Sequence, residues 1–314
     1  MNRGFDLAEG EYLVIVESDD FAEPHMFETL YRTAVEHQLD VVKAGFYQYS
    51  TVPQIHNVPV RSAVKIAGKK VFCPMTDFSK PKEKVDFFKS MPAIWSALYR
   101  RDFIRNNHIR FNKTPGASYQ DLGFCFKVWV KAARVQFLDS CLLHYRVDNE
   151  QSSIHSPGKV YCVCDEYAEM DRFLQENPAE RDKVMPVMMR MKYENYLWNY
   201  ERLAEPLRAE FIHRFCKEFT QHQADGTLSR AYFSWYDWNN LQKIMLDPAR
   251  YHDLYTRKNH GEAVPDFYDA HTAHRPVKNK TIYYFAENVA GAMKYLDELG
   301  LSGTLRICFE KLRK

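Results

Sequence analysis

Two groups of acidic residues, about a hundred positions apart, are the part of this sequence best suited to chemistry. Glu17, Asp19 and Asp20 follow the apolar run EYLVIV (11–16), and Asp121 opens an amphipathic stretch. Such a run is typical of a buried parallel strand, and open α/β sheets bind ligands at the carboxyl ends of their strands. Carboxylate oxygens suit Mg²⁺ or Mn²⁺, which in turn hold phosphate oxygens. The pattern therefore favours a cation and phosphate site.

Helix capping is the simpler interpretation of each group. Asp19 and Asp20 precede a helix that begins near Pro24, and Asp121 precedes another helix. Aspartate is a good N-cap because its carboxylate accepts hydrogen bonds from the first N–H groups of a helix. Taken one at a time, the two groups leave both interpretations open.

The elements around these residues predict an α/β domain. Strands are expected at 11–16 and 41–49, with an amphipathic helix from Met26 to Val35 between them. Residues 50–82 are irregular. The pattern then predicts a short helix at 83–90, a strand or turn at 92–99, helices at 101–107 and 122–133, and two short strands at 135–138 and 142–147.

From about residue 156 the pattern becomes helical. Apolar residues recur at helical spacing over 160–174, and further helices are expected near 188–203, 205–222, 237–246 and 280–298, with a loop around 259–279. Proline-containing pairs separate several of these segments. We therefore predict two domains, 1–155 and 156–314.

Composition excludes several classes of protein. A formal net charge of +2 gives no indication of nucleic-acid binding. The seven cysteines show no metal-site or redox spacing, which is typical of reduced thiols in a cytosolic protein. No stretch approaches the roughly 20 apolar residues of a membrane span, and no signal-peptide core is evident. We expect a cytoplasmic protein.

The ordered set of motifs over residues 2–155 resembles a family 2 glycosyltransferase of the GT-A fold. Each motif alone is weak, but their order and spacing match the family. The residues that carry the resemblance are Asn2, Gly4, Ala8, Gly10-Glu11-Tyr12, Glu17-Ser-Asp19-Asp20, Pro24, Trp95, Leu98, Tyr99, Arg101, Phe103, Ile109, Phe111, Tyr119-Gln-Asp121, Phe124, Tyr145-Arg146 and Ser152-Ser153.

The resemblance implies a fold and a reaction. It implies a mostly parallel GT-A sheet flanked by helices, followed by a mainly helical C-terminal region. The implied reaction moves a sugar from a nucleotide-sugar donor, such as a UDP-sugar, to a glycan or lipid-linked acceptor in surface polysaccharide biosynthesis. A cation, Mg²⁺ or Mn²⁺, would offset the charge that grows on the departing diphosphate.

It also implies roles for individual residues. Asp19, with Asp20 or Glu17, would hold the cation and the ribose–diphosphate end of the donor. Asp121 would be the general base of an inverting single displacement. The remaining assignments are an acceptor site at Trp95, Tyr99 and Gln120, and a late metal ligand at His155. Core packing is the alternative for Trp95 and Tyr99, and an ordinary loop position is the alternative for His155.

Three departures from the family pattern stand beside the matches. Glu17 replaces an aspartate, Gln120 replaces a glutamate, and the strands that hold the nucleotide base and ribose are not found before Met1. The last departure predicts an N-terminally truncated domain. A non-catalytic module that binds a partner or a membrane surface is therefore the alternative function. A metal-dependent phosphate-transfer enzyme is a weaker alternative, because no Gly-rich phosphate loop is present.

The last residues, 301–314, form a basic amphipathic pattern. Leu305, Cys308, Phe309 and Leu312 fall on one face, with Arg and Lys around them. A helix of this kind can lie on an anionic membrane, which would place the protein at the inner face of the plasma membrane. An ordinary solvated helix is the alternative.

Overall fold

The computed structural model describes residues 1–61, 71–113, 119–149 and 160–270. The chain divides into two compact units, Met1–Asn199 and Tyr200–Lys314, and the division falls in the last turn of a long helix. The helices of residues 162–199, which the sequence pattern groups with the helical region, belong to the first unit.

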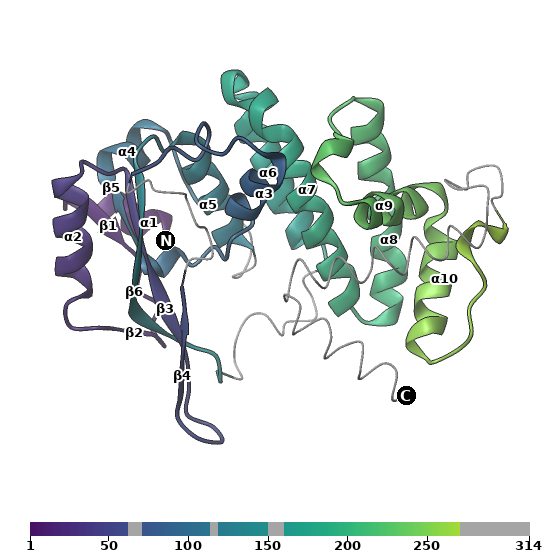
Figure 1. The fold of residues 1–314 in the computed structure, drawn as a ribbon, viewed down its shortest axis with the longest axis horizontal. Coiled ribbons are helices and arrows are strands. Elements are labelled where there is room, and N and C mark those ends of the chain that lie inside the picture. Colours follow the sequence, from purple (N-terminus) through teal and green to yellow (C-terminus); the bar gives the residue numbers. More distant parts are fainter. Residues whose placement is uncertain (62–70, 114–118, 150–159, 271–314) are drawn as a thin grey trace. The chain divides into compact units, whose positions relative to one another are not determined.

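A six-stranded sheet forms the centre of the first unit (Figure 1). Its strands are β1 (Tyr12–Val14), β2 (Phe21–Ala22), β3 (Val41–Ser50), β4 (His56–Val60), β5 (Ala97–Arg100) and β6 (Val135–Arg146). Their order is β1-β5-β3-β6-β2, and β4 pairs with β3. The long strands β3 and β6 lie side by side in the middle, as the continuous burial of residues 41–46 requires.

The α/β class and the helical C-terminal region are confirmed, but the sheet is more mixed than the mostly parallel one that the sequence predicts. In the described part of the chain, β3 and β6 pair in parallel, whereas the other four pairings are antiparallel. One reason is local: only five residues join β3 to β4, and so short a connection allows an antiparallel hairpin but not a crossover.

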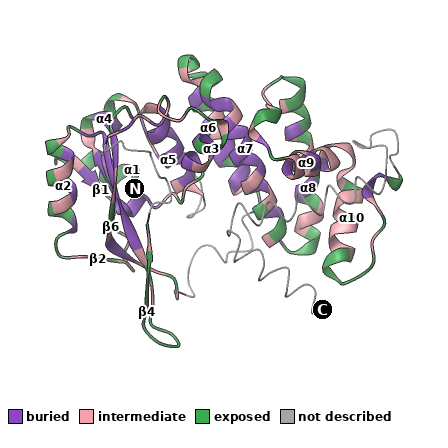
Figure 2. Cartoon of the chain, in the orientation of Figure 1, coloured by how far each residue is buried: buried purple, intermediate pink, exposed green. Residues whose placement is uncertain are grey.

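Helices flank this sheet. Figure 1 shows α2 on one face and α5 on the other. In α2 the residues Met26, Leu30 and Ala34 are buried at four-residue spacing, while Phe27, Tyr31 and Val35 are exposed (Figure 2). The helices of the first unit are α1 (Asn2–Leu7), α2 (Met26–Glu36), α3 (Pro81–Phe88), α4 (Arg101–Asn106), α5 (Gln120–Lys131), α6 (Cys162–Gln175) and α7 (Pro178–Arg202).

Aromatic rings hold α1 and α5 to the segment that precedes α5. Phe111 and Phe124 stack with ring centroids 4.3 Å apart, and Phe5 lies 5.7 Å from each of them. Phe124 is fully buried, so its contribution to stability is about 1.5–3 kcal/mol from burial alone. These contacts join three of the motifs that carry the family resemblance.

Strand β6 corrects another expectation. The sequence predicts two short strands at 135–138 and 142–147, but Val135–Arg146 is one continuous strand. The polar residues Asp139 and Ser140 stay exposed within it. The pairing with β3 shifts register on both sides of Gly45, where a side chain would press against Cys141 Sγ and the Val60 carbonyl, each 3.0 Å away. The strand continues because the bulge lets β6 pair with β3 on both sides of these polar residues.

The second unit contains three described helices, α8 (Glu205–Ala224), α9 (Trp235–Leu246) and α10 (Pro248–Asn259). The sequence pattern misses α10, treating Asp247-Pro248 only as a helix end. Asp247 in fact caps the next helix by accepting a hydrogen bond from the Arg250 N–H at 2.9 Å, and proline suits the first helical position.

In the described part of both units, none of the helices has the length and apolar character needed to span a membrane. The predicted helix at 280–298 and the basic segment 301–314 lie outside the described residues, and the membrane-surface contact stays a prediction.

Candidate active site

The acidic residues Glu17, Asp19 and Asp20 lie in the loop between β1 and β2. Strand β1 is only three residues long, and its pairing with β5 fixes where this loop begins. The Asp20 N–H donates to the Glu17 carbonyl at 3.3 Å, which closes a tight turn. The turn gathers the three carboxylates in one place.

The end of β6 holds this turn. The Arg146 N–H donates to Asp20 Oδ1 at 2.9 Å, and the Asn149 amide donates to Asp19 Oδ2 at 2.8 Å. Arg146 Nε also donates to the Asp19 carbonyl at 3.4 Å. Asp19 and Asp20 are therefore fixed by the end of β6 and the residues just after it, about 130 residues away in the sequence.

Burial and mutual repulsion raise the pKa of two carboxylates of the acidic turn. Burial raises the pKa of Glu17, and the neighbouring charges of Asp20, Asp19 and Asp121 raise it further. Burial likewise raises the pKa of Asp20, against the opposing effect of the hydrogen bond from the Arg146 N–H. Asp20 Oδ2 is buried and accepts no hydrogen bond from the residues that the structure describes. Hard oxygen donors with an unused buried lone pair fit a divalent cation.

A complete set of three or more metal-binding side chains is not assembled among the described residues. His155, the predicted third ligand, lies outside them. The metal site at Asp19 and Asp20 therefore stays a prediction.

Asp121 is the second residue of α5. The residue before the helix, Tyr119, has φ of 58° and ψ of 4°, a conformation that costs a non-glycine residue about 1–2 kcal/mol. Backbone strain of this kind is often found at functional sites. The Asp121 carboxylate accepts a hydrogen bond from the Leu122 N–H at 2.9 Å. Burial raises the pKa of Asp121, and Lys43 is a nearby cation that opposes this rise.

Asp121 lies close enough to the acidic turn for their charges to interact. The charge of Asp121 raises the pKa of Glu17. Tyr145 of β6 lies among all of these groups: its pKa is raised by burial first and then by Glu17, Asp20, Asp19 and Asp121. The fold thus brings together the two acidic groups that the sequence places about a hundred residues apart.

The aromatic residues predicted at the acceptor site are buried. Trp95 is 5% exposed and stacks on Tyr145 with centroids 4.7 Å apart, so it packs against a residue of the site. Tyr99 is 1% exposed, and its hydroxyl donates to the Ile94 carbonyl at 3.1 Å. Gln120 is the first residue of α5, beside Asp121. Contact of these three residues with an acceptor stays a prediction.

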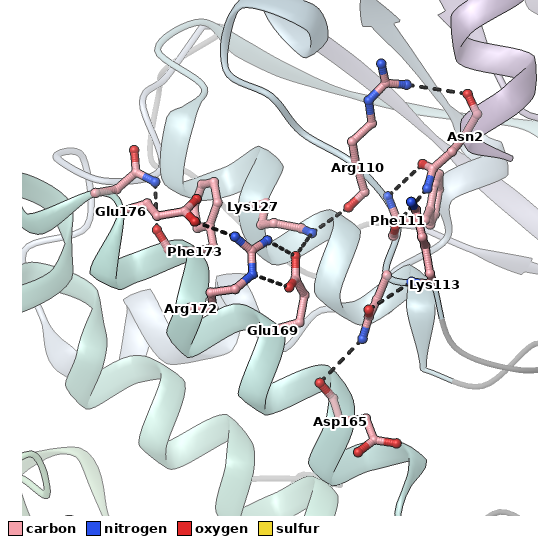
Figure 3. Close-up of polar contacts among 12 residues, drawn as sticks. Asn2, Arg110, Phe111, Lys113, Lys127, Asp165, Glu169, Arg172, Phe173 and Glu176 are labelled. Atoms are coloured by element: carbon pink, nitrogen blue, oxygen red, sulfur yellow. Dashed lines mark hydrogen bonds and ion pairs between the residues drawn. The ribbon is translucent and has the colours of Figure 1, made fainter.

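A polar network joins α5 to its neighbours (Figure 3). The Lys127 ammonium donates to the Arg110 carbonyl and to Glu169 Oε1, the latter at 3.2 Å. Arg172 forms two hydrogen bonds of 2.8 Å with Glu169. Asn2 donates to the Phe111 carbonyl at 2.8 Å and accepts from the Phe111 N–H at 2.9 Å. Asn2, the first residue of the family motif, thus holds the segment that precedes α5 in place.

Two charged residues of this region escaped the sequence analysis. Lys43 interrupts the apolar run of β3, and Glu166 stands next to Tyr167 in the helical stripe of α6. The signal for both was a charge at a position that the pattern assigns to the core. Glu166 is fully buried, and burial raises its pKa to about 7.

Replacing Glu166 with glutamine should change how stability depends on pH. Lys127 opposes the rise in the Glu166 pKa, whereas Glu169 and Asp121 add to it. Between pH 4.5 and about 7 the unfolded chain has lost this proton while the folded chain keeps it, so wild-type stability falls across this range and levels off above about pH 7. We expect the free energy of unfolding of Glu166→Gln, measured relative to that of wild type, to be about 2–3 kcal/mol higher at pH 8 than at pH 5. Urea unfolding at the two pH values measures this gain.

The exposed Glu28 supplies a matched control, because its side chain is 71% exposed. Glu28→Gln should show the same pH dependence as wild type. An equal pH dependence for Glu166→Gln and wild type would mean that folding does not raise the pKa of Glu166.

Comparison with known proteins agrees with this geometry. Residues 1–108 match the model of glycosyl transferase family 2. The chain is 30% identical over 158 residues to the uncharacterized glycosyltransferase EpsJ of Bacillus subtilis, covering 50% of this chain and 44% of EpsJ. It is 29% identical over 192 residues to the uncharacterized glycosyltransferase YibD of Escherichia coli, covering 59% of this chain and 53% of YibD.

A solved structure shares the fold. The S. aureus TarS 1–349 structure in complex with UDP-GlcNAc matches with a TM-score of 0.58 and 14% identity, over 84% of this chain and 72% of that one. The sheet and the helices that flank it are similar to those of that structure. The N-terminal part of the chain, residues 1–108, is similar to glycosyl transferase family 2, and the chain spans about half the length of the curated relatives that it matches.

Proposed function

We propose that this protein transfers a sugar from a nucleotide-sugar donor to a glycan or lipid-linked acceptor in surface polysaccharide biosynthesis. The observation that supports the proposal is that Asp121 lies close enough to the turn of Glu17, Asp19 and Asp20 for its charge to raise the pKa of Glu17. The acidic turn can hold a phosphate-bound cation, and Asp121 can act as a base. Transfer with a diphosphate leaving group needs both functions.

The donor is proposed to be a UDP-sugar. Support comes from the structural match to TarS, which has been solved in complex with UDP-GlcNAc and with UDP. Asp19 and Asp20, with Glu17 beside them, would hold Mg²⁺ or Mn²⁺ and the diphosphate end of the donor. The cation, when bound, would neutralise the charge that develops on the leaving diphosphate.

Asp121 is proposed to be the general base. Its carboxylate would take the proton of an acceptor hydroxyl as the oxygen attacks the anomeric carbon from the face opposite the diphosphate. The C–O bond to the acceptor forms as the bond to the diphosphate breaks, which inverts the anomeric configuration. Burial around Asp121 excludes water and makes its charge more effective than it would be in solution.

Ligand binding by the chain tests the donor site. We expect Mn²⁺ together with UDP to raise the thermal unfolding midpoint by several degrees, because a ligand at 100 times its Kd adds about 2.7 kcal/mol to stability. Asp19→Ala should abolish the shift, because it removes a carboxylate that faces the cation. Differential scanning fluorimetry with Mn²⁺ alone, UDP alone and both together measures it.

Asp182→Ala is the matched control, since the Asp182 side chain is 91% exposed on α7. This variant should keep the full shift. A thermal unfolding midpoint that does not change with any combination of cation and nucleotide would contradict a donor site in this chain and favour the non-catalytic module.

A further inference from the structure

Trp198 of α7 is an exposed aromatic residue on a firmly packed helix. All five tryptophans of the chain lie within the described residues, and Trp198, at 48% exposure, is the only exposed one among them. Tyr196 and Asn199, on either side of it in the helix, are fully buried, so the backbone that carries the indole is held in place. Tryptophan is enriched at binding surfaces because its ring offers a large apolar face and loses little conformational freedom when it binds.

Two contacts tie Trp198 to the residue that precedes α5. The Trp198 and Tyr119 rings meet edge to face, with their centroids 5.9 Å apart. The Tyr119 hydroxyl donates to Asn199 Oδ1 at 3.3 Å. All three residues belong to the first unit. The indole is therefore held beside the start of α5.

The start of α5 carries the proposed base. Asp121 follows Tyr119 by two residues, and two residues of chain span at most about 7 Å. Gln120, a predicted acceptor contact, lies between them. A glycan acceptor with one hydroxyl at Asp121 is therefore of the length needed for a neighbouring sugar ring to reach Trp198.

A second exposed aromatic residue lies at the same junction. The Asn199 side-chain amide donates to the Val160 carbonyl at 3.0 Å. Tyr161 follows Val160 directly and is 36% exposed. The buried Asn199 thus joins the two segments that carry Trp198 and Tyr161, and core packing explains neither exposed ring.

The chemistry of this surface fits a sugar ring. A pyranose has a face of C–H groups that packs against the electron-rich face of an aromatic ring, while its hydroxyl groups stay in contact with water. A nucleobase also stacks on aromatic rings. The nucleotide, however, is proposed to bind at the acidic turn, whereas Trp198 is tied to the segment of Asp121.

We propose that Trp198 is the platform on which a pyranose ring of the acceptor stacks, and that Tyr161 belongs to the same surface. The inference rests on the proposed function for calling that sugar the acceptor. Stacking itself requires neither donor nor turnover, so it can be tested without a transfer assay.

Indole ¹⁵N–¹H spectra of the full chain test the platform. Labelling of tryptophan gives five indole signals, and Trp198→Phe assigns the one from Trp198. We expect lactose, chitobiose and their monosaccharides to shift the Trp198 signal in a saturable manner. The signal of Trp129, which is 2% exposed, should not move. A Trp198 signal that none of these sugars moves would overturn the proposal, and so would one that responds to UDP alone.

Transfer kinetics test the role of the platform in the reaction, with the sugar that shifts the Trp198 signal most as the acceptor. We expect Trp198→Ala to raise the KM for this acceptor about three- to tenfold with little change in kcat, because it removes binding that is equal in the ground and transition states. Trp198→Phe should lie between this variant and wild type. A fall in kcat at an unchanged KM would overturn the proposal.

Phe27→Ala is the matched control, because Phe27 is 47% exposed on α2. Its loss should leave the KM for the acceptor unchanged. An equal rise in KM for Phe27→Ala and Trp198→Ala would count against a specific platform.

Donor binding separates this proposal from the proposed function. Trp198→Ala should keep the Mn²⁺ and UDP shift in unfolding midpoint. Sugar-dependent shifts of the Trp198 signal, in a chain whose midpoint does not respond to Mn²⁺ and UDP, would support the platform and count against the proposed function. A full Mn²⁺ and UDP shift, with a Trp198 signal that no sugar moves, would do the reverse.

Discussion

Replacing Asp121 with asparagine is expected to lower the rate of sugar transfer by about a thousandfold. The amide cannot take the proton of an acceptor hydroxyl, and a positioned general base contributes about 10²–10⁴ to a rate. Asparagine keeps the shape of aspartate, and its oxygen can still accept the hydrogen bond from the Leu122 N–H. The fold and the donor site should remain intact. Single-turnover assays with the nucleotide sugar that gives the largest thermal shift measure the loss.

Asp102→Asn controls for the loss of a carboxylate elsewhere. Asp102 lies in the first turn of α4 with a side chain that is 68% exposed, and its replacement should leave the rate unchanged. Asp121→Asn should also keep the Mn²⁺ and UDP shift in unfolding midpoint. A variant that retains more than about a tenth of the wild-type rate would show that another group takes the proton.

Replacing Gly123 with alanine is expected to destabilise the first unit by about 1–3 kcal/mol. A methyl group on Gly123 would overlap the Glu166 carboxylate, which is fully buried and has little room to move. Alanine is otherwise the better helix former by about 1 kcal/mol, so the steric cost must exceed that gain. Because Gly123 lies two residues after Asp121, the displaced helical turn should also slow transfer. Urea unfolding and transfer assays measure the two effects.

Gly4→Ala is the matched comparison, because Gly4 is also helical and a methyl group there would meet no atom within 4 Å. It should be neutral or stabilising. Adding Glu166→Ala to Gly123→Ala should recover the steric cost, and the double-mutant cycle gives the coupling between the two positions. Equal stability of Gly123→Ala and wild type would mean that the Glu166 carboxyl is free to move aside.

The local part of this structure was predictable from the sequence. The helical spacing after Met26 depends on neighbours a few residues away, and α2 forms where the pattern places it. The apolar run before Glu17 does form a strand, but β1 covers only Tyr12–Val14 and pairs antiparallel at the end of the strand order, so the expectation of a buried parallel strand was wrong. The position of Asp121 at the start of a helix was equally readable. Capping residues and apolar periodicity are local signals, and they carry this information directly.

The long-range part was not predictable in the same way. Nothing in the residues around Trp95 indicates that its ring stacks on Tyr145 of β6, because that contact arises only in the folded chain. The parallel register of β6 on β3 likewise depends on a bulge at Gly45. The polar residues Asp139 and Ser140 resemble a turn between two strands, and only the pairing shows that the strand continues.

The bulge at Gly45 has a consequence for how this chain can vary in evolution. Strand β6 begins at Val135, which exchanges backbone hydrogen bonds with Phe72, and ends at Arg146, whose N–H binds Asp20. One residue gained or lost between these points would turn Tyr145 away from Trp95 and present the wrong N–H to the acidic turn. Substitutions along the exposed middle of β6 should therefore be tolerated by selection, whereas insertions and deletions there should be removed. The length of this strand is as strictly constrained as the identity of the aspartates that it holds.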